Sequence, residues 1–298
     1  MNWQQLIIRT DDKHSELISN ILTDNGSDAV TIQDAEDQPI FEPPLDAMLL
    51  WSQLRVTGLF SALQDLQPVV ELITKKLGFE PEHKIEILED KDWIRAWMDD
   101  FKPMQFGKKL WICPSWHQPP DKNAVNILLD PGLAFGTGTH PTTSLCLRWL
   151  DQYSDLQPIQ QQNFIDYGCG SGILSVAALK LGAQAVYAVD IDIQAIQASI
   201  DNAIKNQQQD KLFTFLPAAF DQQHKDLLCD VLMANILSAP LLELGEFFAS
   251  KIKTGGRIVL SGILFEQAEK IVFHYQQWFH LDPIEKQDDW IRVSGIKI

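Results

Sequence analysis

The chain lacks several features that would reveal its location or chemistry directly. No apolar run approaches the roughly 18 residues of a membrane-spanning helix, and the first residues, MNWQQLIIRTDD, do not have the basic and then apolar segments of a signal peptide. The four cysteines are scattered and form no C-x-x-C pair, which argues against a zinc site and a disulfide framework. We therefore expect no metal, no membrane contact and a cytoplasmic, reducing location.

Basic residues are also scarce, because 24 Lys and Arg face 40 Asp and Glu and the formal net charge is −16. The excess is concentrated in residues 1–100, which hold 20 acids and 8 bases, whereas residues 101–298 hold 20 acids and 16 bases. An acidic domain repels phosphate backbones and attracts basic partners. We expect a basic protein partner and no direct nucleic-acid binding, with a merely solubilising surface as the alternative.

The 298 residues are enough for one small and one large domain. In residues 1–90 the apolar pattern predicts the order β-α-β-β-α-β, a small α+β domain of the ferredoxin-like type. The expected strands are 3–9, 29–32, 48–58 and 84–88, and the expected helices run from Asp11 or Asp12 to about Thr23 and over 61–77. Residues 91–109 are predicted to form a linker helix and hinge, with Trp93 and Trp97 on one helix face.

Residues 110–298 alternate between strand and helix patterns. The expected strands are 110–113, 164–166, 186–189, 213–215, 231–234 and 257–261, with a last pair at 279–283 and 290–298. This order predicts an α/β domain with a doubly wound, mostly parallel sheet and a late hairpin. The glutamine-rich stretches 157–163 and 194–209 are interpreted as surface without a function.

The most informative stretch covers residues 164–190, FIDYGCGSGILSVAALKLGAQAVYAVD, which has the pattern of strand, glycine turn, helix and strand. Gly168, Gly170 and Gly172 allow a tight turn and a close backbone approach to a ligand. Asp190 ends the second strand about 20 residues later, where an acid can accept hydrogen bonds from both hydroxyls of a ribose. The unit is therefore predicted to bind a nucleoside.

The glycine spacing is G-x-G-x-G rather than the dinucleotide pattern G-x-G-x-x-G, and Asp166 precedes it. A carboxylate at that position would repel a pyrophosphate and favour a cationic ligand, which indicates S-adenosylmethionine. A dinucleotide-dependent oxidoreductase and a purely structural turn are the alternatives. Cys169 lies within the loop without an evident base beside it, so it is interpreted as a packing residue.

Two further motifs carry candidate site residues. Residues 129–143, LDPGLAFGTGTHPTT, form a predicted loop and helix start, at which Thr142 and Thr143 offer hydroxyls and amides suited to a carboxylate or adenine. His140 is interpreted as a capping or structural residue in preference to a general base. Residues 230–238, DVLMANILS, place Asn235 at the carboxyl end of a strand, where the catalytic edge of such a sheet lies.

Amino-methylating enzymes often have N-P-P-Y at the position of Asn235, and this chain has Ile-Leu-Ser after the asparagine. That difference argues against methylation of nucleic-acid bases or glutamine side chains. It leaves Asn235 to contact the cofactor or an incoming amine.

Together with DWIRAW, CPSW and YQQWF, these motifs make the whole chain resemble the bacterial ribosomal protein L-eleven (L11) methyltransferases. The resemblance implies a Rossmann-like class I methyltransferase domain, with a small N-terminal domain for substrate recognition. It implies methylation of lysine ε-amines and the N-terminal α-amine of L11, free or in the ribosome, up to trimethylation. The cofactor contacts that it implies are Thr143, Gly168, Gly170, Asp190 and Asn235.

The resemblance leaves the general base unknown, although Asn235 is a candidate for orienting the amine. We expect a monomer. The main alternative is a class I methyltransferase that acts on a different basic protein or a small amine. A ribosome-assembly protein that binds without catalysis is a further alternative, which the intact cofactor motifs oppose.

Overall fold

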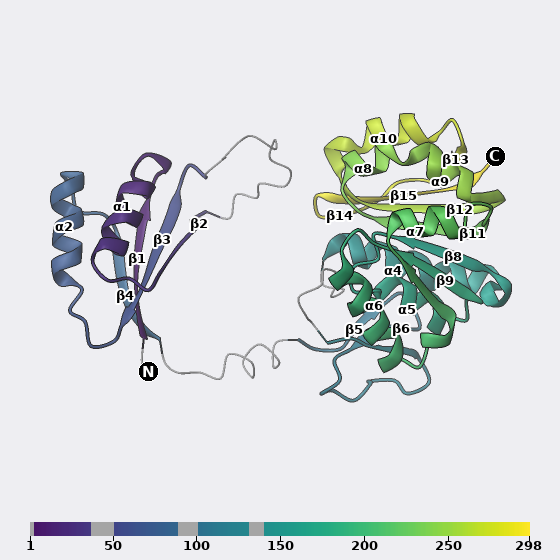
Figure 1. The fold of residues 1–298 in the computed structure, drawn as a ribbon, viewed down its shortest axis with the longest axis horizontal. Helices are drawn as coiled ribbons and strands as arrows, with labels where there is room; N and C mark the ends of the chain where they lie inside the picture. Colours follow the sequence, from purple (N-terminus) through teal and green to yellow (C-terminus); the bar gives the residue numbers. More distant parts are fainter. Residues whose placement is uncertain (1–2, 37–50, 89–100, 131–139) are drawn as a thin grey trace. The chain divides into compact units, whose positions relative to one another are not determined.

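The computed structural model describes residues 3–36, 51–88, 101–130 and 140–298. It divides the chain into two compact units, residues 1–100 and 101–298, each with its own sheet and core (Figure 1). The predicted linker helix, with Trp93 and Trp97, lies outside the described residues. Of the helices in the described ranges, none has the length and apolar character needed to cross a bilayer.

The first unit has the predicted order of elements and the ferredoxin-like arrangement. Its elements are β1 (Trp3–Thr10), α1 (Asp12–Asp24), β2 (Ala29–Asp34), β3 (Leu54–Ser61), α2 (Gln67–Leu77) and β4 (His83–Leu88). The four strands pair antiparallel in the order β2-β3-β1-β4. Alternate residues of β1, such as Leu6 and Ile8, are buried in a core that includes Ile18 of α1 and Ile73 of α2.

Helix α2 begins later than predicted, at Gln67 rather than near residue 61. Pro68 lies in its first turn, where a missing N–H costs no helical hydrogen bond, so the proline marks the start of the helix rather than its interior. Strand β3 ends at Ser61, three residues beyond the predicted end. The start of α1 is as expected, because the side chain of Asp11 accepts a hydrogen bond from the amide of His14.

The second unit contains an eight-stranded sheet. Its strands are β8 (Asn163–Tyr167), β9 (Ala185–Val189), β10 (Leu212–Phe215), β11 (Cys229–Asn235), β12 (Ile252–Leu264), β13 (Phe279–Leu281), β14 (Glu285–Gln287) and β15 (Trp290–Lys297). Their order is β10-β9-β8-β11-β12-β15-β13, with β14 paired to β15. Strands β8 to β12 run parallel and β15 runs antiparallel to both neighbours, which confirms the doubly wound sheet with a late hairpin. The strand order reverses between β8 and β11, and ligands bind at such a switch point in this class of sheet.

Helices cover both faces of this sheet (Figure 1). They are α4 (Pro141–Leu156), α5 (Ile173–Lys180), α6 (Ile193–Lys205), α7 (Pro217–Gln223), α8 (Ser238–Glu243), α9 (Gly245–Lys251) and α10 (Ala268–Tyr275). Short 3-10 turns lie at Ile159–Gln161, Gln209–Lys211 and Phe265–Gln267. Successive strand residues point to opposite faces, so Phe164 packs in the core beneath α4 and α5, whereas Ile165 packs in the core beneath α8 to α10.

A second, three-stranded sheet was only partly expected. Its strands are β5 (Met104–Phe106), β6 (Leu110–Cys113) and β7 (Val125–Leu128), in that order. Only β6 was predicted. Strand β5 lies within the interval predicted as linker and hinge, and it pairs antiparallel with β6.

Candidate functional site

The glycine loop that follows β8 is tightly folded. Gly168, Gly170 and Gly172 have φ of 79°, 54° and 73°, a region that side-chain-bearing residues rarely adopt. The amide of Gly168 donates to the carbonyl of Val189 at the end of β9, with an N···O distance of 2.7 Å. A Cβ atom added to Gly168 would overlap the side chain of Ile236, which follows β11. The loop therefore lies directly on the carboxyl ends of the two neighbouring strands.

Asp190 is held in one orientation by two backbone amides. Its Oδ2 accepts from Gly170 N at 2.9 Å, and its Oδ1 accepts from Asp192 N at 3.0 Å. A carboxylate oxygen can accept more than one hydrogen bond, so both oxygens of this half-buried group keep capacity for ligand hydroxyls. The next side chain, Ile191, is 85% exposed and offers apolar surface beside the carboxylate. This combination suits the polar ribose and the flat base of a nucleoside.

Asp166 has a different environment from the one expected. It is only 1% exposed, and its Oδ2 accepts from Ser175 N at 3.0 Å and from Ser175 Oγ at 2.6 Å, in the first turn of α5. Its Oδ1 has no hydrogen-bond partner among the described residues. Burial raises the pKa of Asp166 to about 6. This carboxyl group anchors α5 beneath the loop and does not face solvent as a ligand-directed carboxylate would.

Asn235 and Thr143 meet at the switch point of the sheet. The side chain of Asn235 donates from Nδ2 to Oγ1 of the buried Thr143, in the first turn of α4, across 3.3 Å. The pairing of Ala234 with Tyr167 places Asn235 beside the start of the glycine loop. The Oδ1 atom of Asn235 is buried and has no partner within the described part of the chain. The site thus contains a buried acceptor that has no partner among the described residues and whose orientation is set by the bond to Thr143.

His140 caps the amino end of helix α4, in agreement with its interpretation as a capping or structural residue. Its Nδ1 lies 2.8 Å from Thr142 Oγ1 and accepts from Thr142 N, and its ring packs edge-on to Trp290 with 4.9 Å between the centroids. Burial lowers the pKa of His140, which keeps the ring neutral at neutral pH.

Cys169 is a packing residue, as expected. It is buried, and its Sγ lies 3.3 Å from Ser199 Oγ. Burial raises the pKa of the Cys169 thiol, which opposes formation of a nucleophilic thiolate.

All five residues predicted to contact the cofactor lie at the carboxyl edge of the sheet. Thr143, Gly168 and Asn235 meet where α4, β8 and β11 converge, and Gly170 and Asp190 lie together between β8 and β9. In the described ranges no group of three or more His, Cys, Asp or Glu side chains is placed to hold a metal.

The sequence interpretation missed two residues of α6, Ser199 and Asn202, which bond to carbonyls of the glycine loop. They belong to the stretch interpreted as functionless surface. The available signal was the pair of small polar residues spaced three apart on the helix, next to the apolar residues that face the core.

Comparisons with known proteins agree with this geometry. A family model described as Ribosomal protein L11 methyltransferase (PrmA) matches residues 2–297. The chain is 52% identical to the Ribosomal protein L11 methyltransferases of Shewanella denitrificans and Shewanella sediminis, over 299 residues that cover 100% of each chain. The crystal structure of ribosomal protein L11 methylase from Lactobacillus delbrueckii subsp. bulgaricus is 31% identical with a TM-score of 0.59, over 66% of this chain and 99% of that chain.

Proposed function

Because this chain belongs to the ribosomal protein L11 methyltransferase family, we propose that it methylates amino groups of ribosomal protein L11. The groups proposed are lysine ε-amines and the N-terminal α-amine, each carrying up to three methyl groups. The observation that supports the choice of an amine is the acceptor Oδ1 of Asn235, which is buried at the switch point beside the glycine loop and has no hydrogen-bond partner among the described residues.

S-adenosylmethionine is the methyl donor, and it supplies a methyl group activated by a positively charged sulfonium. In this proposal Asp190 binds the ribose hydroxyls, and the backbone of Gly168 and Gly170 approaches the cofactor closely. Thr143 lies at the amino end of α4 among the proposed cofactor contacts, and its Oγ1 also accepts the hydrogen bond that orients the amide of Asn235. These residue types fit a nucleoside, and none of the described residues assigned to the site is a Lys or Arg that could bind a pyrophosphate.

An amine must be neutral to attack a methyl group, and a free lysine has a pKa near about 10.4. A partly desolvated site next to a sulfonium lowers the pKa of the amine. Asn235 Oδ1 accepts one N–H and thereby directs the nitrogen lone pair towards the methyl carbon. His140 caps a helix, Cys169 is a buried thiol and Asp166 bonds Ser175, so in this proposal water takes the proton.

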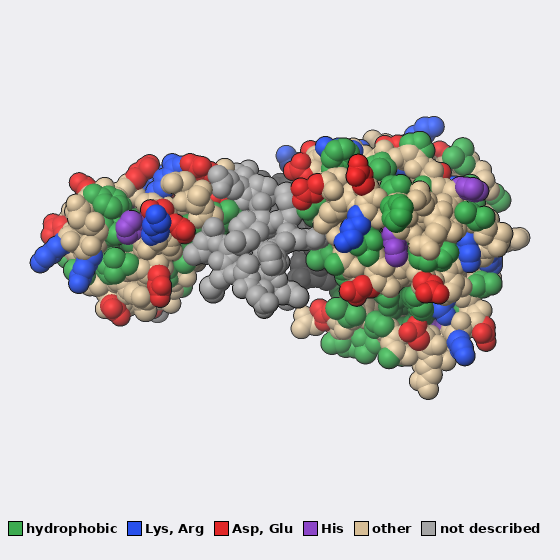
Figure 2. Space-filling model, turned by 90° about the horizontal axis from the view of Figure 1, so that it is seen from above, with side chains coloured by type: hydrophobic (Ala, Val, Ile, Leu, Met, Phe, Trp, Pro, Cys, Tyr) green, Lys and Arg blue, Asp and Glu red, His purple; other side chains and the backbone are tan. Residues whose placement is uncertain are grey.

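The first unit is proposed to recognise the basic ribosomal protein. Its described residues hold 12 acids and 6 bases. On the face drawn in Figure 2, acidic side chains are interspersed with basic and apolar ones and do not form a single patch. We therefore propose distributed charge attraction, which speeds encounter, rather than one acidic pocket. A monomer in the cytoplasm, where its four unpaired cysteines stay reduced, completes the proposal.

The test is to incubate the protein with tritiated S-adenosylmethionine and total ribosomal proteins from cells that lack the enzyme. Mass spectrometry then locates the label. Trimethylated amines on L11 are the expected result. Label on another basic protein or on a small amine would keep the chemistry and overturn the substrate. An absence of label, with cofactor binding intact, would contradict the proposed reaction.

A further inference from the structure

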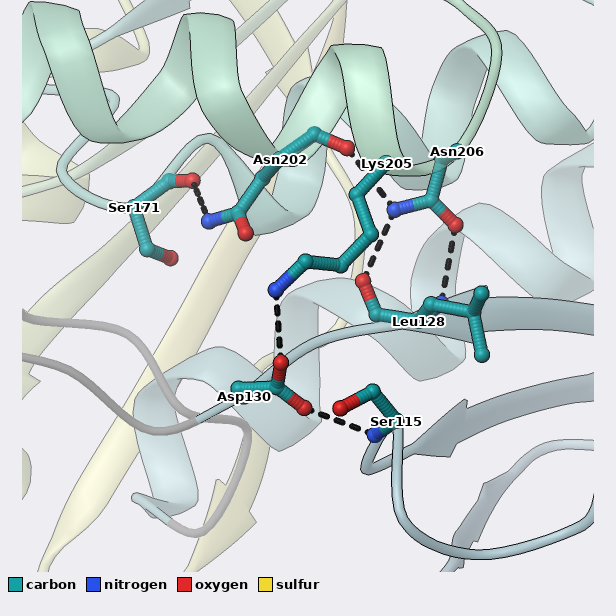
Figure 3. A network of polar contacts seen from close by, with 7 residues as sticks. All are labelled: Ser115, Leu128, Asp130, Ser171, Asn202, Lys205 and Asn206. Atoms are coloured by element: carbon teal, nitrogen blue, oxygen red, sulfur yellow. Dashed lines mark hydrogen bonds and ion pairs between the residues drawn. The ribbon is translucent and has the colours of Figure 1, made fainter.

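One face of helix α6 carries four polar side chains that contact distant parts of the second unit. They are Ser199, Asn202, Lys205 and the residue that follows the helix, Asn206. Steps of three and four residues place them on the same side of the helix. Figure 3 shows the contacts of Asn202, Lys205 and Asn206, which reach towards two separate segments of chain.

The first segment is the glycine loop. Asn202 Nδ2 donates to the carbonyl of Ser171 at 2.8 Å, and Ser199 Oγ donates to the carbonyl of Gly170 at 3.0 Å. A Cβ atom on Gly172 would lie within 3 Å of the backbone of Ser199, so helix and loop are in close contact. Two consecutive carbonyls of the loop are thus held by α6.

The second segment is the end of β7, one of the two edge strands of the three-stranded sheet. The side chain of Asn206 accepts from Leu128 N and donates to Leu128 O, both at 2.8 Å. This amide replaces a neighbouring strand, because it bonds to both backbone groups on the open edge. Asn206 is only 5% exposed, so its hydrogen bonds are shielded from water.

An ion pair extends this contact to the start of the motif that includes Thr143. Lys205 Nζ lies 2.6 Å from Asp130 Oδ2, and Asp130 Oδ1 accepts from Ser115 N at 2.6 Å. Although burial alone would raise the pKa of Asp130, the hydrogen bonds from Lys205 and Ser115 lower it below its usual value. Asp130 is therefore charged at neutral pH and held from two sides (Figure 3).

We propose that this face of α6 is a positioning element for the cofactor site, which holds the glycine loop and the end of β7 in one fixed relation. Glycines lose more conformational freedom on ordering than other residues, so a loop with three of them needs support from outside to keep its backbone groups in place. Support that exists before the ligand arrives lowers the cost of binding. The inference rests on cofactor binding and is independent of which amine is methylated.

The test measures binding of S-adenosylhomocysteine by calorimetry, with no protein substrate present. Asn202→Ala removes the hydrogen bond to Ser171 and is expected to raise the Kd about 3- to 10-fold. Lys205→Met is expected to raise the Kd by a similar factor, and Lys205→Arg to restore binding. The matched control is Gln197→Ala, on the exposed side of the same helix, where only a bond to Asp201 is lost.

Kinetics distinguish positioning from general destabilisation. At saturating cofactor the variants should keep the wild-type kcat and show the increase only in the KM for S-adenosylmethionine. A fall in melting temperature with an unchanged Kd would overturn the inference, and so would an equal effect of Gln197→Ala. If wild-type protein binds the cofactor but does not label L11, the proposed substrate fails while this inference stands.

Discussion

The side-chain amide of Asn235 donates to Oγ1 of Thr143 across 3.3 Å, although the two residues lie 92 positions apart in the chain. The contact joins the last residue of β11 to the first turn of α4. Because Nδ2 is occupied by Thr143, the amide is oriented with Oδ1 unpaired among the described residues. An acceptor held in this way is what an incoming N–H group requires.

Replacement of Asn235 by alanine removes that acceptor, and kcat for amine methylation should fall about 100-fold, which corresponds to ~2.7 kcal/mol of transition-state stabilisation. Thr143→Val leaves the side-chain amide of Asn235 without the hydroxyl that orients it, and kcat should fall about 10-fold. Single-turnover assays with saturating cofactor measure both effects. Asn123→Ala, at an exposed position, is the control. Near wild-type kcat in Asn235→Ala would remove the asparagine from the mechanism.

Asp190→Ala should weaken cofactor binding about 10- to 100-fold, because hydrogen bonds to a charged acceptor contribute about 1.5–3 kcal/mol. The variant also loses the bonds from Gly170 N and Asp192 N, which order the loop. Asp190→Asn keeps one acceptor oxygen, so its Kd should lie between those of Asp190→Ala and the wild type. Calorimetry with S-adenosylhomocysteine gives the Kd values. Equal binding by all three proteins would show that the ribose lies elsewhere.

A comparison of two glycines separates backbone strain from a clash at the site. Gly168 and Gly255 both have φ of 79°, but a Cβ on Gly168 overlaps Ile236, whereas a Cβ on Gly255 meets nothing within 4 Å. Gly255→Ala should therefore lose only about 1–2 kcal/mol of unfolding free energy and bind the cofactor normally. Gly168→Ala should lose more stability and abolish binding. The loop assignment fails if the Gly168 variant binds as tightly as the Gly255 variant in calorimetry.

The buried Asp166 predicts a specific dependence of stability on pH. Burial raises its pKa from 3.8 to about 6, so the folded state holds a proton that the unfolded state releases. The resulting stabilisation is fully present below the unfolded pKa of 3.8 and is lost as the pH rises to about 6. The loss amounts to about 3 kcal/mol at 1.36 kcal/mol for each pKa unit.

Urea unfolding of wild type and Asp166→Asn at pH 4, 5, 6 and 7 measures this effect as a difference between the two proteins. The free energy of unfolding of the variant should increase relative to that of the wild type as the pH rises, because the variant carries no buried charge. Asp210→Asn, at an exposed position, should give a constant difference. A difference for Asp166→Asn that is also constant with pH would show that the carboxyl group titrates normally.

The order of strands and helices follows from the sequence alone, because apolar periodicity and glycine are local properties. The stretch from Phe164 to Asp190 shows this most clearly, since its strand, turn, helix and strand lie where the pattern placed them. Strands β5 and β7 were not predicted. They have three and four residues, which is few for an alternation to be distinguished from loop, although β6, also of four residues, was predicted.

The sequence also predicted that the residues after the strands, Gly168, Asp190 and Asn235, lie at one edge of the sheet, because parallel strands present their carboxyl ends on the same edge. Only the tertiary structure decided which hydrogen bonds the side chains at the site make. Asp166 is turned towards Ser175, Asn235 is paired with Thr143, and a polar face of α6 holds the loop and β7. Each of these depends on contacts between segments distant in the chain, and on burial that the contacts create, so no local pattern contains it.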